Sequence, residues 1–553
     1  MPVLEPRTAP PPDYYADNLL RLVQTVRAQY NDLLTAPELA LTSNILNLGG
    51  PARRLYARLI GRRGPLFRVD RLAYREVPDV RAALGELAAA GLVRLCGPTP
   101  ADRLLAEHTI AELAQSFPHV CRSRKGDFVA HIAARYPDRE ILRRLAPCSP
   151  WVELGHPLLV RTLCALFFGD ANQDLTTFVL EDLGVTRFEP YDLDGAGRLF
   201  AERVSLDDYL ELTLSVGRRL ERLRQMWCSE AAEHEVARLW DESPHRFVER
   251  RRSRLLNQLG ALAERARDHD VALTAYARST HAPARERRTR LLARLGDFAG
   301  AGRLLHVIGA TPGSRLEAEF AARFDPHTLR LRRAPAVIRQ ECLRLAAPPE
   351  LRDTSSARRP TPGVLEGAAL AALLTRPGIG AHLENRFSLS FFGLAFWDIV
   401  FAPIRGAFLN PYQLGPVDLF WSDFAAARAP LLERRIDELR SPDRLAARVL
   451  DTWHHKRGVS NALVAWDALS RTLIERAVAA VPIVAWQALF DRLANDLREA
   501  RTGFPDLALF YDDGGYEFVE VKGPGDQLRA EQRLWFSLFD RAGVSARVLR
   551  VDW

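Results

Sequence analysis

The feature that most constrains the fold of this chain is a hairpin pattern near its C-terminus. A first strand is predicted after Asp506, the turn falls on residues 512–515 (Asp-Asp-Gly-Gly), and a second strand spans Tyr516 to Lys522. Pairing across this turn places Asp506 beside Glu520, to within one residue of register. We therefore expect a small sheet with two carboxyl groups at one end.

Side-chain alternation along the second strand divides its residues between two faces of the sheet. One face receives Phe518, Glu520 and Lys522, and the other receives Val519 and Val521. Two carboxylates and an ammonium group thus converge at the end of the sheet. This combination suits a divalent cation and a water molecule that attacks a phosphodiester, so the pattern predicts a nuclease site.

Lysine is rare in this chain, which makes its presence on that face informative. The sequence has 76 basic residues, of which only Lys125, Lys456 and Lys522 are lysines. Lysine is a compact point charge that can hold one water, whereas arginine is a rigid, permanently protonated fork. Chance placement of one of three lysines is the alternative interpretation.

The composition is that of an ordinary globular chain with several domains. The net charge of +7 and the pI near 9.2 permit a nucleic-acid partner without requiring one. The six cysteines are scattered and contain no Cys-x-x-Cys pair, which favours reduced thiols in the cytoplasm. We find no signal peptide and no apolar run of membrane length, so no membrane partner is expected.

A stripe of arginines near the N-terminus is a candidate DNA-contacting surface. Residues 53–76 contain eight arginines against Asp70 and Glu76, with Tyr56 and Phe67 between them. Such a stripe can bind phosphates. It can equally be a solvated helix face in an arginine-rich protein, and the sequence alone favours neither interpretation.

The expected fold class is mostly helical in the N-terminal and middle regions, with an α/β module at the C-terminus. Residues 346–363, rich in Pro, Ser and Thr, form the clearest linker. The expected regions are an N-terminal helical DNA-binding domain (1–99), a small helical, SAP-like module (100–148), a helical, tetratricopeptide-like region (149–345), this linker, and a nuclease domain (364–553).

The predicted site has the parts that phosphodiester hydrolysis needs. A hard divalent cation requires carboxylate oxygens and open positions for water and phosphate. Asp506 and Glu520 are the obvious ligands, the Val521 carbonyl can add a third oxygen, and Lys522 can position the attacking water.

Several separated motifs resemble one known nuclease family. Pro505-Asp506, residues 520–528 and residues 532–535 closely resemble the VRR-NUC module, a branch of the PD-(D/E)XK nucleases. Further stretches that fit the Fanconi-associated nuclease family are residues 382–387, 461–467, 166–169, 172–175 and 53–63. The resemblance covers nearly the whole chain, with its motifs in the right order.

The resemblance implies a structure-specific 5′-flap endonuclease and 5′→3′ exonuclease that acts on branched or 5′-flap DNA in interstrand crosslink repair. It implies Mg²⁺ or Mn²⁺ as cofactor, held by Glu384 from a helix together with Asp506 and Glu520, with Lys522 as the catalytic lysine. The remaining implied roles are support of the site by Asp526 and Gln532, and DNA binding by Arg62, Arg63 and Arg498.

Three of the residues with implied roles also have a simpler structural explanation. Asp526 can be a simple helix N-cap, Gln532 a buried amide that needs a partner, and Glu384 a surface carboxylate. No Cys/His cluster precedes the helical region, so no ubiquitin-binding zinc finger is expected, which suggests a compact bacterial member working at the nucleoid. The rival functions are a Holliday-junction resolvase, an inactive DNA-binding scaffold, and a helical adaptor whose arginines face solvent.

Overall fold

The computed structural model describes residues 14–62, 64, 66–95, 101–121, 124–145, 151–173, 186–191, 193, 197–332, 338–345 and 363–552. The chain divides into two compact units, one of residues 1–185 with 198–210, the other of residues 186–197 with 211–553. The predicted fold class is confirmed, since helices predominate and an α/β sheet lies in the C-terminal part. Apart from Gly363, the predicted linker lies outside the described residues.

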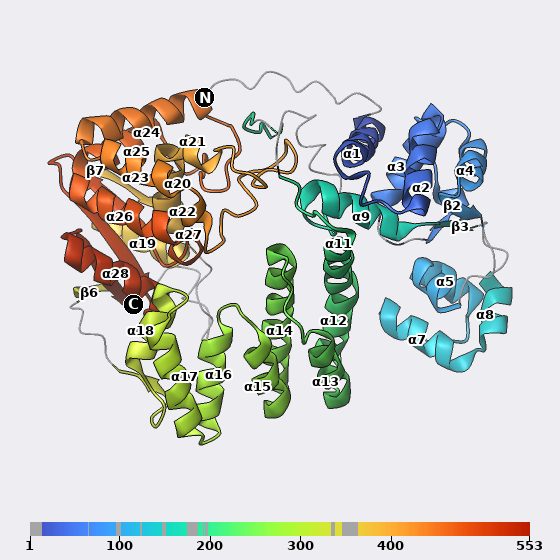
Figure 1. Cartoon of the computed structure of the whole chain (residues 1–553), viewed down its shortest axis with the longest axis horizontal. Helices are drawn as coiled ribbons and strands as arrows, with labels where there is room; N and C mark the ends of the chain where they lie inside the picture. Colours follow the sequence, from blue (N-terminus) through green and yellow to red (C-terminus); the bar gives the residue numbers. More distant parts are fainter. Residues whose placement is uncertain are drawn as a thin grey trace. The chain divides into compact units, whose positions relative to one another are not determined.

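The first unit is built mainly from helices (Figure 1). Capping boxes fix two helix starts, with Thr35 and Glu38 opening α2 and Thr109 and Glu112 opening α6. The helices are α1 (Tyr14–Tyr30), α2 (Ala36–Asn47), α3 (Gly50–Ile60), the short 3₁₀ helix η1 (Val69–Arg71), α4 (Val80–Ala89), α5 (Ala101–Glu107), α6 (Ile110–Ser116), α7 (Lys125–Arg135), α8 (Asp138–Leu145), α9 (Pro157–Phe168) and α11 (Arg203–Leu210).

A small antiparallel sheet adds strands to this unit, including two within residues 1–99, which were predicted to form a helical domain. Its strands are β1 (Leu66–Arg68), β2 (Val93–Leu95) and β3 (Trp151–Leu154), in the order β1-β3-β2. Each has only three or four residues, which is too short for an alternating pattern to stand out in the sequence.

The helices at the start of the second unit pack in consecutive order (Figure 1). Gly260 of α14 lies against the ring of Tyr276 in α15, where an added Cβ would be 2.7 Å from the ring, so this crossing requires glycine. The elements are the π-helix η2 (Glu211–Val216), α12 (Gly217–Gln225), α13 (Ser229–Arg238), α14 (Arg246–Ala266), α15 (His269–Arg278), α16 (Ala284–Arg294), α17 (Phe298–Ala310), α18 (Arg315–Arg323), β4 (Phe324–Asp325) and β5 (Arg330–Leu331).

A five-stranded mixed sheet, ordered β6-β10-β9-β8-β7, carries the predicted hairpin. The predicted hairpin is β8 and β9, and β10 joins β9 in parallel after helix α28. The strands are β6 (Gln340–Arg344), β7 (Gly378–His382), β8 (Leu507–Tyr511), β9 (Tyr516–Lys522) and β10 (Ala546–Asp552).

The two edge strands were not predicted. β7 pairs with β8 in antiparallel fashion, and β6 pairs with β10 in parallel. Because β6 precedes residue 364, the sheet extends beyond the expected 364–553 range. The last helix begins at Ala530, with Arg529 as its N-cap.

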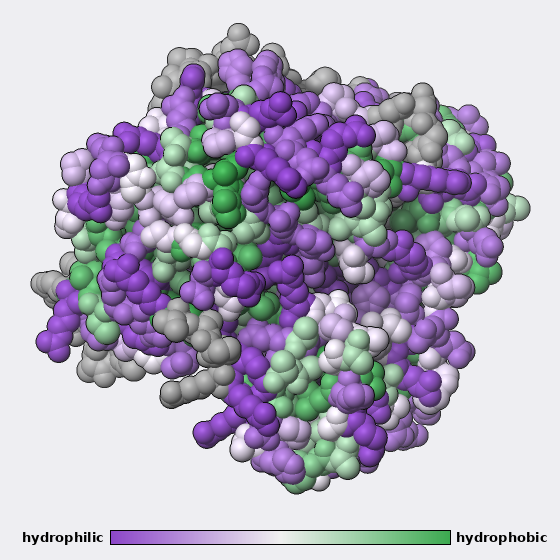
Figure 2. All heavy atoms as spheres, turned by 60° about the vertical axis from the view of Figure 1, so that its left-hand side comes forward, coloured by the Kyte–Doolittle hydropathy of each residue, from purple (hydrophilic) through white to green (hydrophobic). Residues whose placement is uncertain are grey.

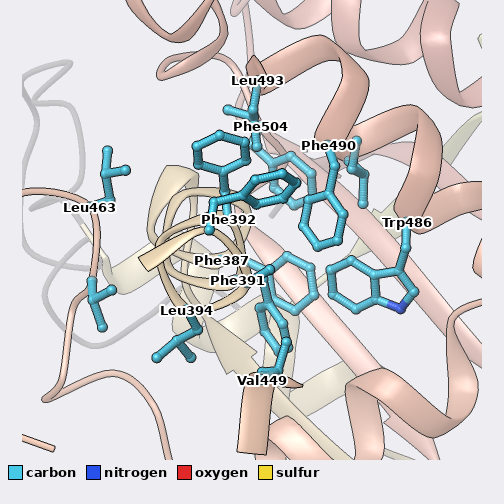
Figure 3. Close-up of a cluster of buried hydrophobic side chains, with 14 of the residues drawn as sticks. Phe387, Phe391, Phe392, Leu394, Val449, Leu463, Trp486, Phe490, Leu493 and Phe504 are labelled. Atoms are coloured by element: carbon cyan, nitrogen blue, oxygen red, sulfur yellow. The ribbon is translucent and has the colours of Figure 1, made fainter. Parts of the chain in front are cut away.

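Apolar side chains cover both faces of this sheet. An aromatic cluster fills one face and includes Phe387, Phe391, Trp486 and Phe504 (Figure 3), whereas α19 covers the other. As alternation predicted, Phe518 belongs to the first cluster and the two β9 valines to the second. The helices are α19 (Val364–Leu373), α20 (Asn385–Ala395), α21 (Trp397–Val400), α22 (Phe424–Ala427), α23 (Ala429–Glu438), α24 (Pro442–Lys456), α25 (Arg471–Ala480), α26 (Ile483–Asn495), α27 (Leu497–Ala500) and α28 (Ala530–Ala542).

The face drawn in Figure 2 is largely hydrophilic, with hydrophobic residues in separate patches. Among the described residues, no single helix is both long and apolar enough to cross a membrane. Within the described part of the chain, α25 and α26 have the required length and composition only when taken together, and they are bent by 109° at the break between them.

Candidate functional site

The hairpin brings Asp506 and Glu520 together as predicted. Leu507 pairs with Val519, so the next antiparallel position places Asp506 opposite Glu520. The Asp506 Oδ2 atom accepts a hydrogen bond of 2.8 Å from the backbone N–H of Val521, which fixes the carboxylate at the end of the sheet.

Glu520 is almost completely buried, with an exposed fraction of 1%. Its Oε1 atom lies 2.6 Å from Lys522 Nζ and also accepts a hydrogen bond from Gln532 Nε2. Its Oε2 atom is buried and has no hydrogen-bond partner among the described residues. A buried, unpartnered carboxylate oxygen beside a second carboxylate is the donor arrangement that a hard cation would complete.

Glu384 lies beside Asp506, but it is not on a helix as the sequence suggested. It is the residue before α20, in the turn that follows β7. Its backbone N–H and that of Leu383 donate to the Asp506 carbonyl at 3.1 and 2.9 Å. With φ at 49° and ψ at −138°, Glu384 holds a conformation that non-glycine residues adopt only where surrounding structure imposes it, and such residues cluster at functional sites.

His382, the last residue of β7, completes a group that the sequence reasoning missed. Its Nε2 atom lies 3.2 Å from Glu384 Oε1. Ligand atoms of His382, Glu384 and Asp506 all lie within 4.8 Å of one another, which is close enough to hold one metal ion. The signal was available, because His382 is part of the motif that contains Glu384.

The electrostatics of the acidic pair favour a bound cation. Burial raises the pKa of Glu520, and the neighbouring Asp506 carboxylate raises it further, whereas Lys522 opposes the shift. Burial also raises the pKa of Asp506, with added contributions from Glu366 and Glu384. A divalent cation would reverse both effects, since it stabilises the charged carboxylates.

The two predicted supporting residues differ in their placement. Gln532 is buried, and its Oε1 atom accepts from the Arg529 backbone N–H at 3.0 Å while its amide group contacts Glu520. Asp526 is exposed and accepts from the Gly523 N–H at 3.3 Å. The alternative interpretation of Asp526 as the N-cap of the last helix is wrong, because Arg529 occupies that position.

The N-terminal arginine stripe is partly neutralised within the first unit. Arg58 is paired with Glu76, and Arg68 is paired with Asp70 and Glu112. Arg62 has no carboxylate partner among the residues that the structure describes in this unit, and its Nη1 atom donates to the Tyr74 hydroxyl at 3.0 Å.

Arg62 also lines a cavity of about 280 Å³ together with Phe67, Arg68, Arg71 and Trp151. Among the described residues that line this cavity, Arg62 has no ion-pair partner, although Glu107 is one of them, so a phosphate bound there would face one carboxylate besides the guanidinium groups. Arg63 lies outside the described residues.

Arg498 lies in α27 next to two arginines of α14, and we call Arg250, Arg254 and Arg498 the arginine cluster. Among residues 197–332 and 363–552, none of the three is paired with a carboxylate. Burial lowers the pKa of Arg250 to about 10, with further contributions from Arg254 and Arg498. Burial and Arg498 likewise lower the pKa of Arg254. These guanidinium groups repel one another, and Asp423 offsets the charge of Arg250 only in part, so the cluster is a candidate anion site.

The mixed sheet, its acidic pair and the adjoining lysine define the chain as a metal-dependent DNA nuclease. The model of the VRR-NUC domain matches residues 440–553, and the model of the FAN1 HTH domain matches residues 13–94. The chain belongs to the Fanconi-associated nuclease family, as the following relatives show.

The Fanconi-associated nuclease 1 homolog of Pseudomonas aeruginosa is 32% identical over 567 residues, which cover 100% of this chain and 98% of that protein. The homolog of Oryza sativa subsp. japonica is 26% identical, covering 97% of this chain and 62% of the plant protein. The crystal structure of paFAN1 bound to 2-nucleotide 5′-flap DNA with a gap matches with a TM-score of 0.89 and 31% identity, covering 99% of both chains.

Proposed function

We propose that this chain cleaves branched DNA as a 5′-flap endonuclease and 5′→3′ exonuclease in the repair of interstrand crosslinks. The observation that carries the catalytic part is the buried, unpartnered Oε2 atom of Glu520 beside Asp506 and Lys522. The substrate class is supported by the match over both full chains to paFAN1 bound to a 5′-flap DNA. Because the nearly full-length relative is from Pseudomonas aeruginosa, we propose that the chain acts in a bacterial cytoplasm, at the nucleoid.

The residues fit a Mg²⁺ or Mn²⁺ ion. Asp506, Glu520 and Glu384 would hold it, with His382 and the Val521 carbonyl as additional ligands. When bound, such an ion lowers the pKa of its water and neutralises charge that develops on the phosphate.

Lys522 supplies the remaining charge at this site. Its ammonium group is held 2.6 Å from Glu520 and is largely buried, so it keeps a fixed position. From there it can donate a hydrogen bond to the attacking water and orient it toward the phosphorus. Gln532 donates a hydrogen bond to the same carboxylate oxygen of Glu520. This contact keeps the Glu520 side chain from rotating away.

The basic residues would bind the DNA backbone rather than its bases. Arg62 and Arg63 would contact phosphates in the first unit, and Arg498 would do so in the second together with Arg250 and Arg254. Phosphate contacts position DNA without reading its sequence, which suits an enzyme that recognises branch structure.

A cleavage assay on matched DNA substrates tests this proposal. We expect a 5′-flap duplex to be cut when Mg²⁺ or Mn²⁺ is present and to stay intact in EDTA. Binding without cleavage in either metal would favour an inactive scaffold. Preferred, symmetric cutting of a four-way junction would favour a resolvase. Absence of flap binding, or weak binding that does not fall with added salt, would favour an adaptor whose arginines merely face solvent.

A further inference from the structure

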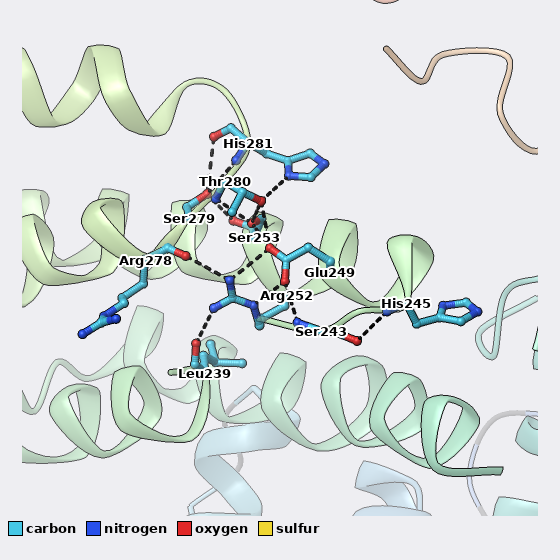
Figure 4. Close-up of polar contacts among 10 residues, drawn as sticks. All are labelled: Leu239, Ser243, His245, Glu249, Arg252, Ser253, Arg278, Ser279, Thr280 and His281. Carbon is cyan, nitrogen blue, oxygen red and sulfur yellow. Dashed lines mark hydrogen bonds and ion pairs between the residues drawn. The ribbon is translucent and has the colours of Figure 1, made fainter. Parts of the chain in front are cut away.

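A hydrogen-bonded network joins α14 to the segment that follows α15 (Figure 4). At its centre, the Glu249 carboxylate accepts from Arg252 Nε at 2.7 Å and Nη2 at 3.0 Å. The hydroxyl groups of Ser253 and Thr280 both donate to Glu249 Oε1 at 2.8 Å. Thr280 Oγ1 in turn lies 3.0 Å from His281 Nδ1. The network thus runs from a buried ion pair to an imidazole ring.

The acceptors in this network determine which nitrogen of His281 carries the proton. A carboxylate is the strongest acceptor present, so we assign the single Thr280 hydroxyl proton to Glu249. Thr280 Oγ1 is then free to accept from His281, whose proton must be on Nδ1. In the neutral ring, the lone pair is therefore on Nε2, the atom that does not contact the network.

The imidazole of His281 lies in the electric field of the arginine cluster, because Arg498 Nη2 donates to the backbone carbonyl of the next residue, Ala282, at 3.5 Å. The charged groups that act on it are Glu249, Arg250 and Arg254 of α14 and Arg498 of α27. Burial, followed by Arg250 and Arg498, lowers the pKa of His281 to about 4. Without an anion, the ring is therefore neutral near pH 7.

We propose that Thr280 and Glu249 position His281 as a proton-linked member of the arginine cluster, whose Nε2 atom takes up a proton from solvent when a DNA phosphate binds there. This inference rests on the proposed function, since it needs a DNA phosphate at the cluster. A bound phosphate cancels the field of the guanidinium groups and accepts a hydrogen bond from Nε2–H. On the other side of the ring, the relay through Thr280 to Glu249 stabilises the imidazolium.

Proton uptake makes DNA binding tighter as the pH falls. This effect applies at pH values between the pKa of His281 in the free protein and its higher pKa in the complex. In that range, the DNA affinity rises by up to about tenfold for each unit by which the pH decreases. Thr280 and Glu249 act through His281, so they are positioning residues, and their removal should change this pH dependence.

Calorimetry on the full-length protein with a 5′-flap duplex in EDTA tests the proposal. We compare buffers of different ionisation enthalpy and repeat the titration between pH 5.5 and 8. The wild-type protein should take up protons on binding. His281→Gln should abolish this component and flatten the pH profile. Thr280→Val should weaken proton uptake, and Thr280→Ser, which keeps the hydroxyl, should restore it. The control is His306→Gln, an exposed histidine of α17, which should behave like wild type.

Equal proton uptake by wild type and His281→Gln would overturn the inference, as would identical pH profiles for Thr280→Val and Thr280→Ser. Tight binding of the flap by wild type without proton uptake would also overturn it, but would leave the proposed function intact. If the wild-type protein does not bind the flap at any pH, the proposed function fails, and the inference fails with it.

Discussion

The side-chain amide of Gln532 donates a hydrogen bond to Oε1 of Glu520, so a residue of α28 holds a candidate metal ligand of β9 in place. Gln532→Ala would release this oxygen and leave Glu520 free to turn. Loss of such a supporting contact typically lowers metal affinity or activity by about 10–100-fold. Flap cleavage measured against metal concentration checks this, with the exposed Gln527→Ala as control. Equal loss in both variants would show that Gln532 has no special role.

Removal of either central catalytic group should stop cleavage without preventing DNA binding. Asp506→Ala deletes a ligand, and Lys522→Ala deletes the group that orients the water, so each should reduce cleavage by at least about 100-fold. Cleavage rates and flap affinity are measured on the same preparations. A variant that keeps wild-type activity would take its residue out of the mechanism.

Charge repulsion at the buried acidic pair should lower the stability of the metal-free protein. Asp506→Asn removes one of the charges and can still accept from Val521 N–H, so it should raise the melting temperature in EDTA by roughly 2–4 °C, for a gain on the order of 1 kcal/mol. Asp540→Asn, an exposed position on α28, should leave it unchanged.

The same melting experiment tests the metal site. Added Mn²⁺ should stabilise the wild-type protein against unfolding. When the Mn²⁺ concentration is a hundred times its dissociation constant, the expected gain is about 2.7 kcal/mol. The Asp506→Asn variant should respond less. A melting temperature that falls in Asp506→Asn, or the same metal response in both proteins, would contradict this account.

His382 should influence which metal the site prefers. Imidazole is a borderline ligand that later transition metals accept more readily than Mg²⁺ does. His382→Ala should therefore weaken Mn²⁺ binding more than Mg²⁺ binding. Titration calorimetry with each ion gives the ratio of affinities, and nitrogen coupling in the electron paramagnetic resonance of bound Mn²⁺ reports the ligand directly. Nitrogen coupling that survives in His382→Ala would exclude His382 as its source.

Arg62 and Arg63 should contribute to DNA affinity without sequence preference. The double variant Arg62→Ala with Arg63→Ala should weaken binding to all sequences alike and reduce the salt dependence by up to about two counterions. Arg143→Ala serves as control, because Arg143 is exposed and paired with Glu140. Unchanged affinity in the double variant would return this stripe to the solvated-face interpretation.

The sequence was most informative where structure depends on near neighbours. Side-chain alternation on either side of one short turn predicts the hairpin. The same pattern predicts that Asp506 lies opposite Glu520 and that Lys522 lies on the same face. The sequence also predicted that Gln532 has a hydrogen-bond partner, because a buried amide must be hydrogen-bonded.

Features that depend on distant segments could not be predicted. Glu384 reaches the site because β7 pairs with β8, which lies more than a hundred residues later, and the resulting backbone strain has no local sequence signal. The arginine cluster likewise joins α14 to α27, so in the sequence Arg250 and Arg254 are only two among many arginines.

The central claim is that the carboxylates of Asp506, Glu520 and Glu384 gather around one divalent ion. Anomalous diffraction from a crystal soaked in Mn²⁺ tests it most directly. We predict a manganese peak in contact with Glu520 Oε2 and with carboxylate oxygens of the other two residues. An empty site, with Glu384 turned away from the other two side chains, would contradict the account.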